Sequence, residues 1–167
     1  MLTNCVVYLI INQKIKNMQD NRKVVEQSKA VAFFLGGNAL FTFRNKETDT
    51  RFTYKVLVDH KDNTLYSVSV LNGPDNTANY RKFGTIKVEN GMPFFTALGV
   101  HASEKLYCRW FDRILLDLAI GLTLPKLEIW HCGRCCRCGR LLTVPRSVDM
   151  GIGPECENKV SLINSML

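Results

Sequence analysis

The stretch that decides the fold is residues 51–58, RFTYKVLV, in which polar and apolar side chains alternate. An alternation with a period of two is the pattern of a β-strand that buries one face. Turn-rich polar segments lie on both sides of this stretch and bound it as a strand. The other strand candidates are residues 39–43, 65–71, 83–88 and 93–97. The sequence therefore predicts an antiparallel β-meander.

The pattern changes after residue 103. The apolar residues that then recur at every fourth position are Leu106, Trp110, Ile114 and Leu118. This spacing predicts one amphipathic helix over about residues 104–120, with Ser103 as its N-cap and Gly121 at its end. The apolar stripe has to cover something, and the inner face of the meander is the available partner. We therefore expect an α+β domain over residues 31–130, which closes with a short strand at residues 126–130.

Seven cysteines are distributed unevenly along the chain. Four of them lie within seven residues, namely Cys132, Cys135, Cys136 and Cys138. Cys156 follows further along the chain. Residues 5–11 are apolar but lack the basic residues and the cleavage site of a signal peptide, so we expect no export. Cysteines clustered at this spacing in a reducing compartment predict a metal site rather than a disulfide scaffold.

Two overlapping C-x2-C pairs exist, Cys132 with Cys135 and Cys135 with Cys138, and the second pair forms the better knuckle. Gly139 follows them, and a glycine adopts without a Cβ penalty the turn that folds the backbone back toward the metal. The backbone amides of such a turn point at the thiolates and offset their negative charge.

Cys156 is the expected distal ligand. Pro154 suits the first position of a helix, which puts Cys156 in the first turn, where the helix dipole stabilises a thiolate. A knuckle, a loop or hairpin over residues 141–150 and a helix that donates a ligand together predict a treble-clef-like zinc lobe over residues 131–167.

The fourth ligand has to come from upstream, because position 159 is a lysine. His131 is the first candidate, since it ends a strand and leaves three residues before Cys135, and Cys132 is the alternative. This donor set indicates a structural Zn²⁺ rather than a catalytic one. An iron–sulfur cluster on Cys132, Cys135 and Cys138 is another reading, although the usual fourth cysteine and its trailing proline are missing.

The first 30 residues form an N-terminal extension in this interpretation. Residues 5–11 are either an extra strand or part of an upstream segment, with translation beginning at Met18. They are too short to span a bilayer. Residues 12–27 indicate a linker or a frayed helix.

A distinctive run of residues spans the cysteine cluster. It consists of His131, Gly133-Arg134-Cys135, Arg137-Cys138-Gly139-Arg140, Leu142-Thr143-Val144-Pro145 and Gly151-Ile152-Gly153-Pro154-Glu155-Cys156. In these residues the chain resembles a family of short, uncharacterised proteins encoded by bacteriophages, plasmids and their bacterial hosts, and the resemblance covers about residues 31–156. It implies zinc binding and a mobile-element origin, but no reaction. Cys132 and Cys136 are not positions that the motif is expected to require.

Charge suggests the class of partner. The formal net charge is +7 and the sequence pI is about 9.1, which favours polyanionic partners. The arginines that crowd around the knuckle are Arg134, Arg137, Arg140 and Arg146. We therefore expect a binding protein that contacts nucleic acid through its basic surface. The alternative for these arginines is that they only solvate the lobe or pair with neighbouring carboxylates.

A second hypothesis is a protein-binding inhibitor of a host enzyme or defence complex, although no local motif marks it. An enzyme is not expected, because the sequence contains no nucleophile elbow, P-loop, dinucleotide fingerprint or paired-carboxylate motif. His60 and His101 lie in polar loops without evident partners. No small-molecule substrate and no membrane are indicated, and we expect a cytoplasmic protein of a bacterial host cell.

Overall fold

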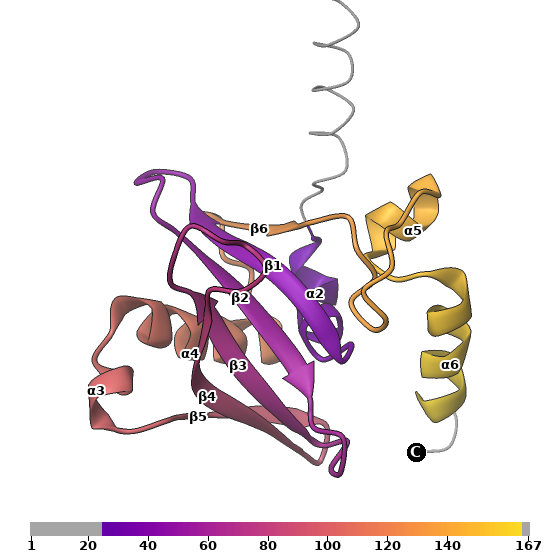
Figure 1. Ribbon diagram of the computed structural model, residues 1–167. Coiled ribbons are helices and arrows are strands. Elements are labelled where there is room, and N and C mark those ends of the chain that lie inside the picture. Colours follow the sequence, from indigo (N-terminus) through magenta and orange to yellow (C-terminus); the bar gives the residue numbers. More distant parts are fainter. Residues whose placement is uncertain (1–24, 165–167) are drawn as a thin grey trace, which may run out of the picture.

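The computed structural model describes residues 25–164, with side chains up to residue 159. The predictions for residues 5–11 and for a start at Met18 lie outside the described residues. The described chain forms a curled, six-stranded antiparallel sheet with helices on one face and a small C-terminal lobe beside it (Figure 1). This confirms the predicted α+β fold class.

Six strands form the sheet, in the order β5-β4-β3-β2-β1-β6. Their bounds are Asn38–Asn45 (β1), Arg51–Val58 (β2), Leu65–Leu71 (β3), Tyr80–Glu89 (β4), Met92–Ala97 (β5) and Leu127–His131 (β6). The first five strands form the predicted meander, and every neighbouring pair is antiparallel. β6 pairs with the other edge of β1, with Phe41 opposite His131. The strand that leads into the cysteines is thereby anchored to the sheet.

Aromatic side chains fill the inner face of the sheet. The large ones that are almost fully buried there are Phe41, Phe43, Tyr54 and Phe83. Alternate residues of β1 and β3 are buried, as the period-two pattern predicts. The Tyr54 hydroxyl donates a hydrogen bond to the backbone carbonyl of Tyr107 at 2.8 Å, so this buried polar group is satisfied.

The predicted amphipathic helix covers this face as α4, Leu106–Ala119. Phe111 lies at its centre, fully buried, with its ring centroid 5.2 Å from that of Tyr54. The predicted N-cap was wrong: Ser103 ends a separate short helix, α3 (Val100–Ser103), and its hydroxyl donates to the carbonyl of Val100 at 2.6 Å. Because α3 ends at Ser103 and α4 begins only at Leu106, the N-cap position of α4 is Lys105, which makes no side-chain cap bond.

A second helix, α2 (Gln27–Phe34), packs on the same face, whereas the sequence indicated a linker or a frayed helix up to residue 27 and no helix directly after it. Its Phe34 ring stacks on Phe41 at 4.1 Å between centroids. The Gln27 side-chain amide donates to the carbonyl of Leu124 at 2.9 Å and its oxygen accepts from the amide of Leu124 at 2.7 Å. The core therefore reaches upstream of residue 31. Periodicity could not reveal this helix, because an apolar run as short as residues 30–35 fits a strand equally well.

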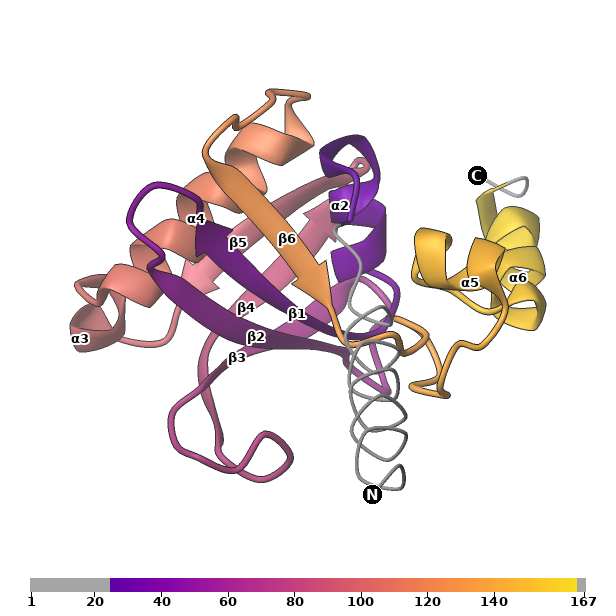
Figure 2. The same cartoon turned by 90° about the horizontal axis from the view of Figure 1, so that it is seen from above.

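The C-terminal lobe lies on the far side of α2 from the sheet (Figure 2). It contains α5 (Pro145–Met150) and α6 (Pro154–Asn164). The sequence suggested a loop or hairpin over residues 141–150, where the structure has α5, with a proline in its first turn and Gly151 in the left-handed conformation behind it. The lobe is otherwise the predicted treble-clef-like order of knuckle, connection and ligand-bearing helix.

The lobe and the sheet are in direct contact through the knuckle. Cys136 belongs to the main core, and its carbonyl accepts a hydrogen bond from the amide of Asn38 at 2.6 Å. Gly36 approaches Cys136 so closely that an added Cβ would lie 2.9 Å from its carbonyl oxygen. Within residues 25–164, no helix combines the length and the apolar character needed to cross a membrane.

Candidate metal centre

Directly after β6 the chain turns back on itself in a tight knuckle. Arg134 and Leu141 pair as an isolated antiparallel bridge. Inside it, the amide of Cys135 donates to the carbonyl of Arg140, and the amide of Gly139 donates to the carbonyl of Cys135, both at 2.9 Å. Gly139 has a φ of +74°, which is the left-handed turn expected of a glycine at this position.

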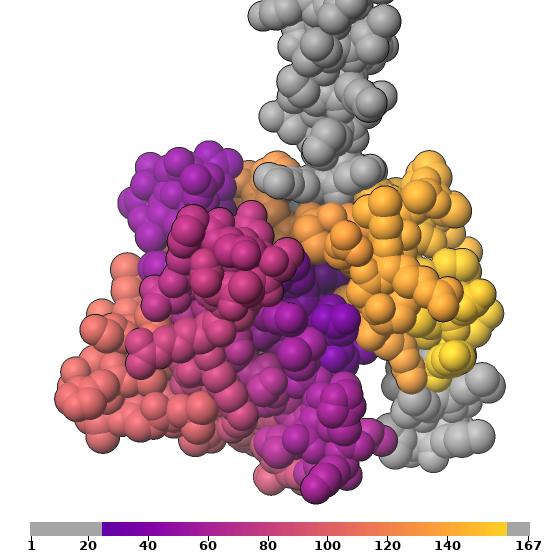
Figure 3. Space-filling view, in the orientation of Figure 1, coloured from indigo at the N-terminus to yellow at the C-terminus, as the bar shows by residue number. Residues whose placement is uncertain are grey.

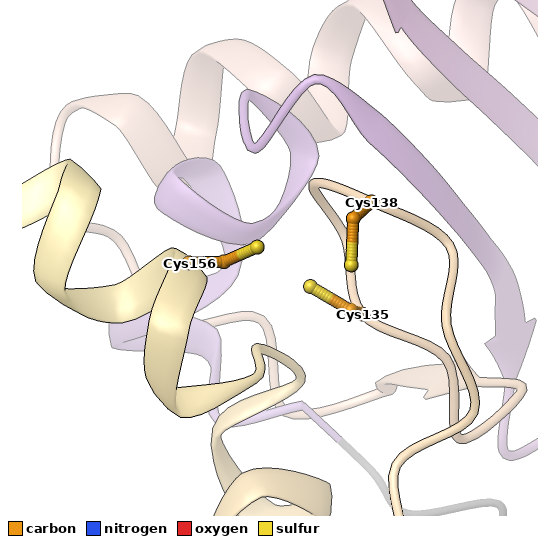
Figure 4. Close-up of side chains that lie close together, drawn as sticks. All are labelled: Cys135, Cys138 and Cys156. Atoms are coloured by element: carbon orange, nitrogen blue, oxygen red, sulfur yellow. The ribbon is translucent and has the colours of Figure 1, made fainter.

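The knuckle brings three sulfur atoms together. The Sγ atoms of Cys135, Cys138 and Cys156 all lie within 4.8 Å of one another, and Figure 4 shows them converging from the knuckle and from the start of α6. A tetrahedral Zn²⁺ with Zn–S bonds of about 2.3 Å needs sulfur atoms about 3.8 Å apart. The three cysteines therefore fit a single metal ion with little adjustment.

Backbone amides support Cys135 as a thiolate. Burial by itself raises the pKa of the Cys135 thiol, but amides of Cys138, Gly153 and Arg137 point at its sulfur and bring that pKa down to about 7. The Gly153 amide donates to the Cys135 sulfur at 3.4 Å. This donor comes from the turn before α6, and nothing in the sequence marked it.

Cys156 lies in the first turn of α6, as predicted. Burial raises the pKa of its thiol to about 11, and the neighbouring Cys138 and Cys135 contribute to the increase. Three thiols this close repel one another once they lose their protons. A divalent cation between them removes that repulsion, so the site favours a metal-bound state.

The candidates for the fourth ligand lie outside this group of three. His131 is buried at the end of β6, where its Nδ1 accepts a hydrogen bond from the amide of Gly133 at 3.0 Å and its ring lies 5.7 Å from that of Phe33. Cys132 lines a hollow on the outer face of the sheet instead. Cys136 lies in the main core, where burial raises its pKa to about 12. The fourth ligand thus stays a prediction.

The four arginines proposed for nucleic acid separate into two pairs. Arg140 lies 3.8 Å from Glu155, and Arg146 lies 3.0 Å from Glu157, both as ion pairs at the lobe surface. Arg134 and Arg137 form no ion pair with any described carboxylate; Arg134 donates to the Gly139 carbonyl at 3.1 Å.

Arg134 and Arg137 instead line hollows together with residues of the outer face of the sheet. Figure 3 shows the side of the molecule on which the segment after β6, in orange, lies against the strands. Arg137 lines a hollow of about 460 Å³ together with Lys82, which we call the larger hollow. Arg134 lines a hollow of about 220 Å³ with Lys55, which we call the smaller hollow. Basic residues are scattered along the strands in the sequence, and the fold brings two of them, Lys55 and Lys82, into the same hollows as Arg134 and Arg137.

The comparisons with known proteins point to the same end of the chain. The model of a family described as "Family of unknown function (DUF6011)" matches residues 131–161. These residues contain the knuckle, α5 and the beginning of α6, so the similarity covers the candidate metal centre and leaves out the sheet. No curated protein and no solved structure matches the chain. The match agrees with the expected resemblance to an uncharacterised family over the lobe alone, since residues 31–130 lie outside it, and it indicates no activity.

Proposed function

We propose that this chain is a non-enzymatic, cytoplasmic binding protein of phage or mobile-element origin. In this proposal one Zn²⁺ holds the C-terminal lobe together, and the basic surface between the knuckle and the sheet contacts nucleic acid. The metal part rests on the convergence of Cys135, Cys138 and Cys156. The nucleic-acid part rests on one observation: Arg134 and Arg137 share hollows with lysines of the sheet and are not neutralised by described carboxylates.

A structural role for the metal follows from the small size of the lobe's own core. Its buried residues are Cys135, Leu142 and Val148, with Ile152 and Cys156 packed against them. A structural Zn²⁺ contributes about 10–16 kcal/mol of apparent binding free energy, which such a cluster cannot match. Zinc fits a thiolate-rich site of this kind, and elemental analysis is expected to find one zinc per chain. A brown protein with visible absorbance would indicate an iron–sulfur cluster instead.

The metal and the nucleic-acid surface are linked through the knuckle. Arg137 lies between the ligands Cys135 and Cys138, and Arg134 immediately precedes the first of them. Since the metal fixes the path of this loop, it also fixes where both arginines stand. We therefore expect that removal of the metal with a chelator weakens nucleic-acid binding.

Titration with single- and double-stranded DNA and RNA at several salt concentrations tests the proposal. Replacement of both Arg134 and Arg137 by Gln is expected to weaken binding and to lower the slope of log K against log salt by about 1 for each arginine. The matched control is the double variant Arg140→Gln/Arg146→Gln, which removes the same charge from ion-paired positions and should change the slope less. No binding at low salt, or an affinity that salt does not change, would refute the proposal.

A protein-binding role is the second candidate, and one observation favours it. A groove of about 540 Å³ runs between α4 and the segment that leads into β6, and its apolar lining includes Trp110, Ile114, Leu124 and Leu127. Apolar grooves of this size are typical docking sites. Capture of a stable partner from host lysate by the wild-type chain, lost when Trp110 is replaced by Ala, would support an inhibitor of a host enzyme or defence complex.

A further inference from the structure

The two hollows on the outer face of the sheet differ in size and share one wall. The larger hollow is lined by Gly37, Asn38, His60, Lys82, Thr85 and Arg137, among others. The smaller one is lined by Asn38, Lys55, Asn76, Tyr80 and Arg134, among others. Asn38 lines both hollows, and its backbone N–H donates a hydrogen bond to the Cys136 carbonyl, which ties this residue to the knuckle. The hollows are therefore neighbours, and a single extended ligand can occupy both.

The chemistry of both hollows favours an anion. Neither Lys82 nor Lys55 forms an ion pair with a described carboxylate, and the same holds for the two arginines. Among the described residues, one carboxylate lines the larger hollow: Asp59, whose oxygen accepts hydrogen bonds from the backbone amides of Lys61 and Asp62, at 2.8 and 3.2 Å, and whose charge offsets one of the two cations there. No described acidic residue lines the smaller hollow. The smaller hollow thus offers two cations to a ligand, and the larger one keeps a net positive charge.

The smaller hollow also offers an aromatic ring. The ammonium group of Lys55 lies 5.6 Å from the centroid of the Tyr80 ring, as a cation–π contact. Tyr80 is half-buried at the start of β4, so part of its ring is open to a ligand. Nearby, Asn76 and Thr77 supply amide and hydroxyl groups that can pair with the edge of a base. The ammonium group lies over the ring, so a base that stacks there takes its place and leaves the long Lys55 side chain to contact a phosphate; an aromatic ring with a cation is the combination that binds unpaired bases.

The size of the hollows limits what can enter. Pockets for drug-sized ligands start at about 300 Å³, so the larger hollow can take one nucleotide and the smaller one only part of a nucleotide. A duplex keeps its bases stacked and paired inside the helix and cannot place them in recesses. A single strand can turn successive bases outward.

From these observations we propose that the two hollows hold successive nucleotides of a single-stranded nucleic acid, with one base stacked on Tyr80. This inference rests on the proposed function and narrows its ligand from nucleic acid in general to single strands. Arg134 and Arg137 then contact two phosphate groups on either side of Asn38.

The test is fluorescence anisotropy with a labelled single-stranded oligonucleotide of mixed sequence and with the same sequence as a duplex, in both DNA and RNA. The wild-type protein is expected to bind the single strand at least about tenfold more tightly. Tyr80→Leu should weaken single-strand binding about tenfold, because stacking on an aromatic ring is lost. Tyr80→Phe is the matched control: it keeps the ring and should retain the affinity.

Thermal unfolding of both Tyr80 variants shows whether a loss of binding comes from a loss of folding. Equal affinity for single strand and duplex, with Tyr80→Leu as tight as wild type, would refute this inference while leaving the proposed function standing. The absence of binding to any of the oligonucleotides would refute both.

Discussion

The sheet and the C-terminal lobe bury very different amounts of apolar side chain. The core on the inner face of the sheet contains more than twenty buried residues, whereas the lobe's own cluster contains three. Aromatic rings contact one another throughout the sheet core, while the lobe gathers three thiols within 4.8 Å. The first region can fold by burial of apolar surface, whereas the second has so small a core that the proposed metal ion would have to supply most of its stability. With that metal in place, one short chain would combine two means of stabilisation.

The largest effect should come from removing the metal. Replacement of Cys135 by Ser, or treatment with a strong chelator, is expected to release the metal and unfold the lobe, because about 10–16 kcal/mol of binding free energy is lost. The sheet should stay folded. Elemental analysis measures the metal, and amide hydrogen exchange compares protection in residues 132–159 with protection in β1 to β5.

Cys108→Ser provides the matched control for this experiment, because Cys108 is a buried thiol of α4 outside the candidate site. It should keep the full metal content, even if the sheet loses some stability. Full protection of the lobe in the metal-free protein would show that the two regions do not differ in the way described.

A smaller loss of stability, confined to the sheet and its helices, should follow from Phe111→Ala. Phe111 is 0% exposed and packs against Tyr54, Phe83 and Phe95. Its loss leaves a cavity and should lower the free energy of unfolding of the sheet by about 3–5 kcal/mol, as measured in urea. Phe94→Ala, at a position 54% exposed, should cost far less. A loss of metal from folded Phe111→Ala protein would mean that the lobe depends on the sheet core.

The smallest of these effects should come from the junction between the regions. In Gly36→Ala the new methyl group would meet the sulfur, the Cβ and the carbonyl oxygen of Cys136. Such crowding typically costs about 1–3 kcal/mol and should loosen the contact between lobe and sheet. Hydrogen exchange at the Asn38 amide, which donates to the Cys136 carbonyl, reports on that contact.

The double variant Gly36→Ala/Cys136→Ala distinguishes crowding from other causes, because the smaller side chain at 136 removes part of the clash. It should be less destabilised than the sum of the single variants. Gly91→Ala is a control that strains a turn at a φ of +77° without meeting any neighbour. Additive single-variant costs would contradict the close contact between residues 36 and 136.

The elements of the fold that could be predicted from the sequence are those marked by a pattern among residues close together in the chain. The strands of the meander, α4 and the placement of Cys156 in the first turn of a helix follow from local periodicity and from Pro154. The helix α2 was missed because its short apolar run lacks a distinguishing period, and α5 because its six residues carry no periodic signal. The position of β6 beside β1 depends on a long-range pairing that no local pattern encodes.

In the candidate site, too, the features marked by local spacing could be predicted, and those that depend on distant residues could not. The three cysteines were identified from their spacing, and the structure brings them together. The Gly153 amide on the Cys135 sulfur, and the shared hollows of Arg134 with Lys55 and of Arg137 with Lys82, required the fold. These contacts join residues far apart in the sequence, and composition and spacing carry no information about them.

The position of β6 also sets the order in which the protein can mature. Every strand of the sheet, and both helices α2 and α4, precede Cys132 in the chain. During synthesis the sheet can therefore close while the cysteines are still being added, since domains fold as units from the N-terminal side. The thiols are then synthesised after the rest of the sheet, whose last strand, β6, leads directly into their loop. Under the proposed function, metal capture would be the last step of maturation, and a cell short of the ion would accumulate a protein that is folded but incomplete at one end.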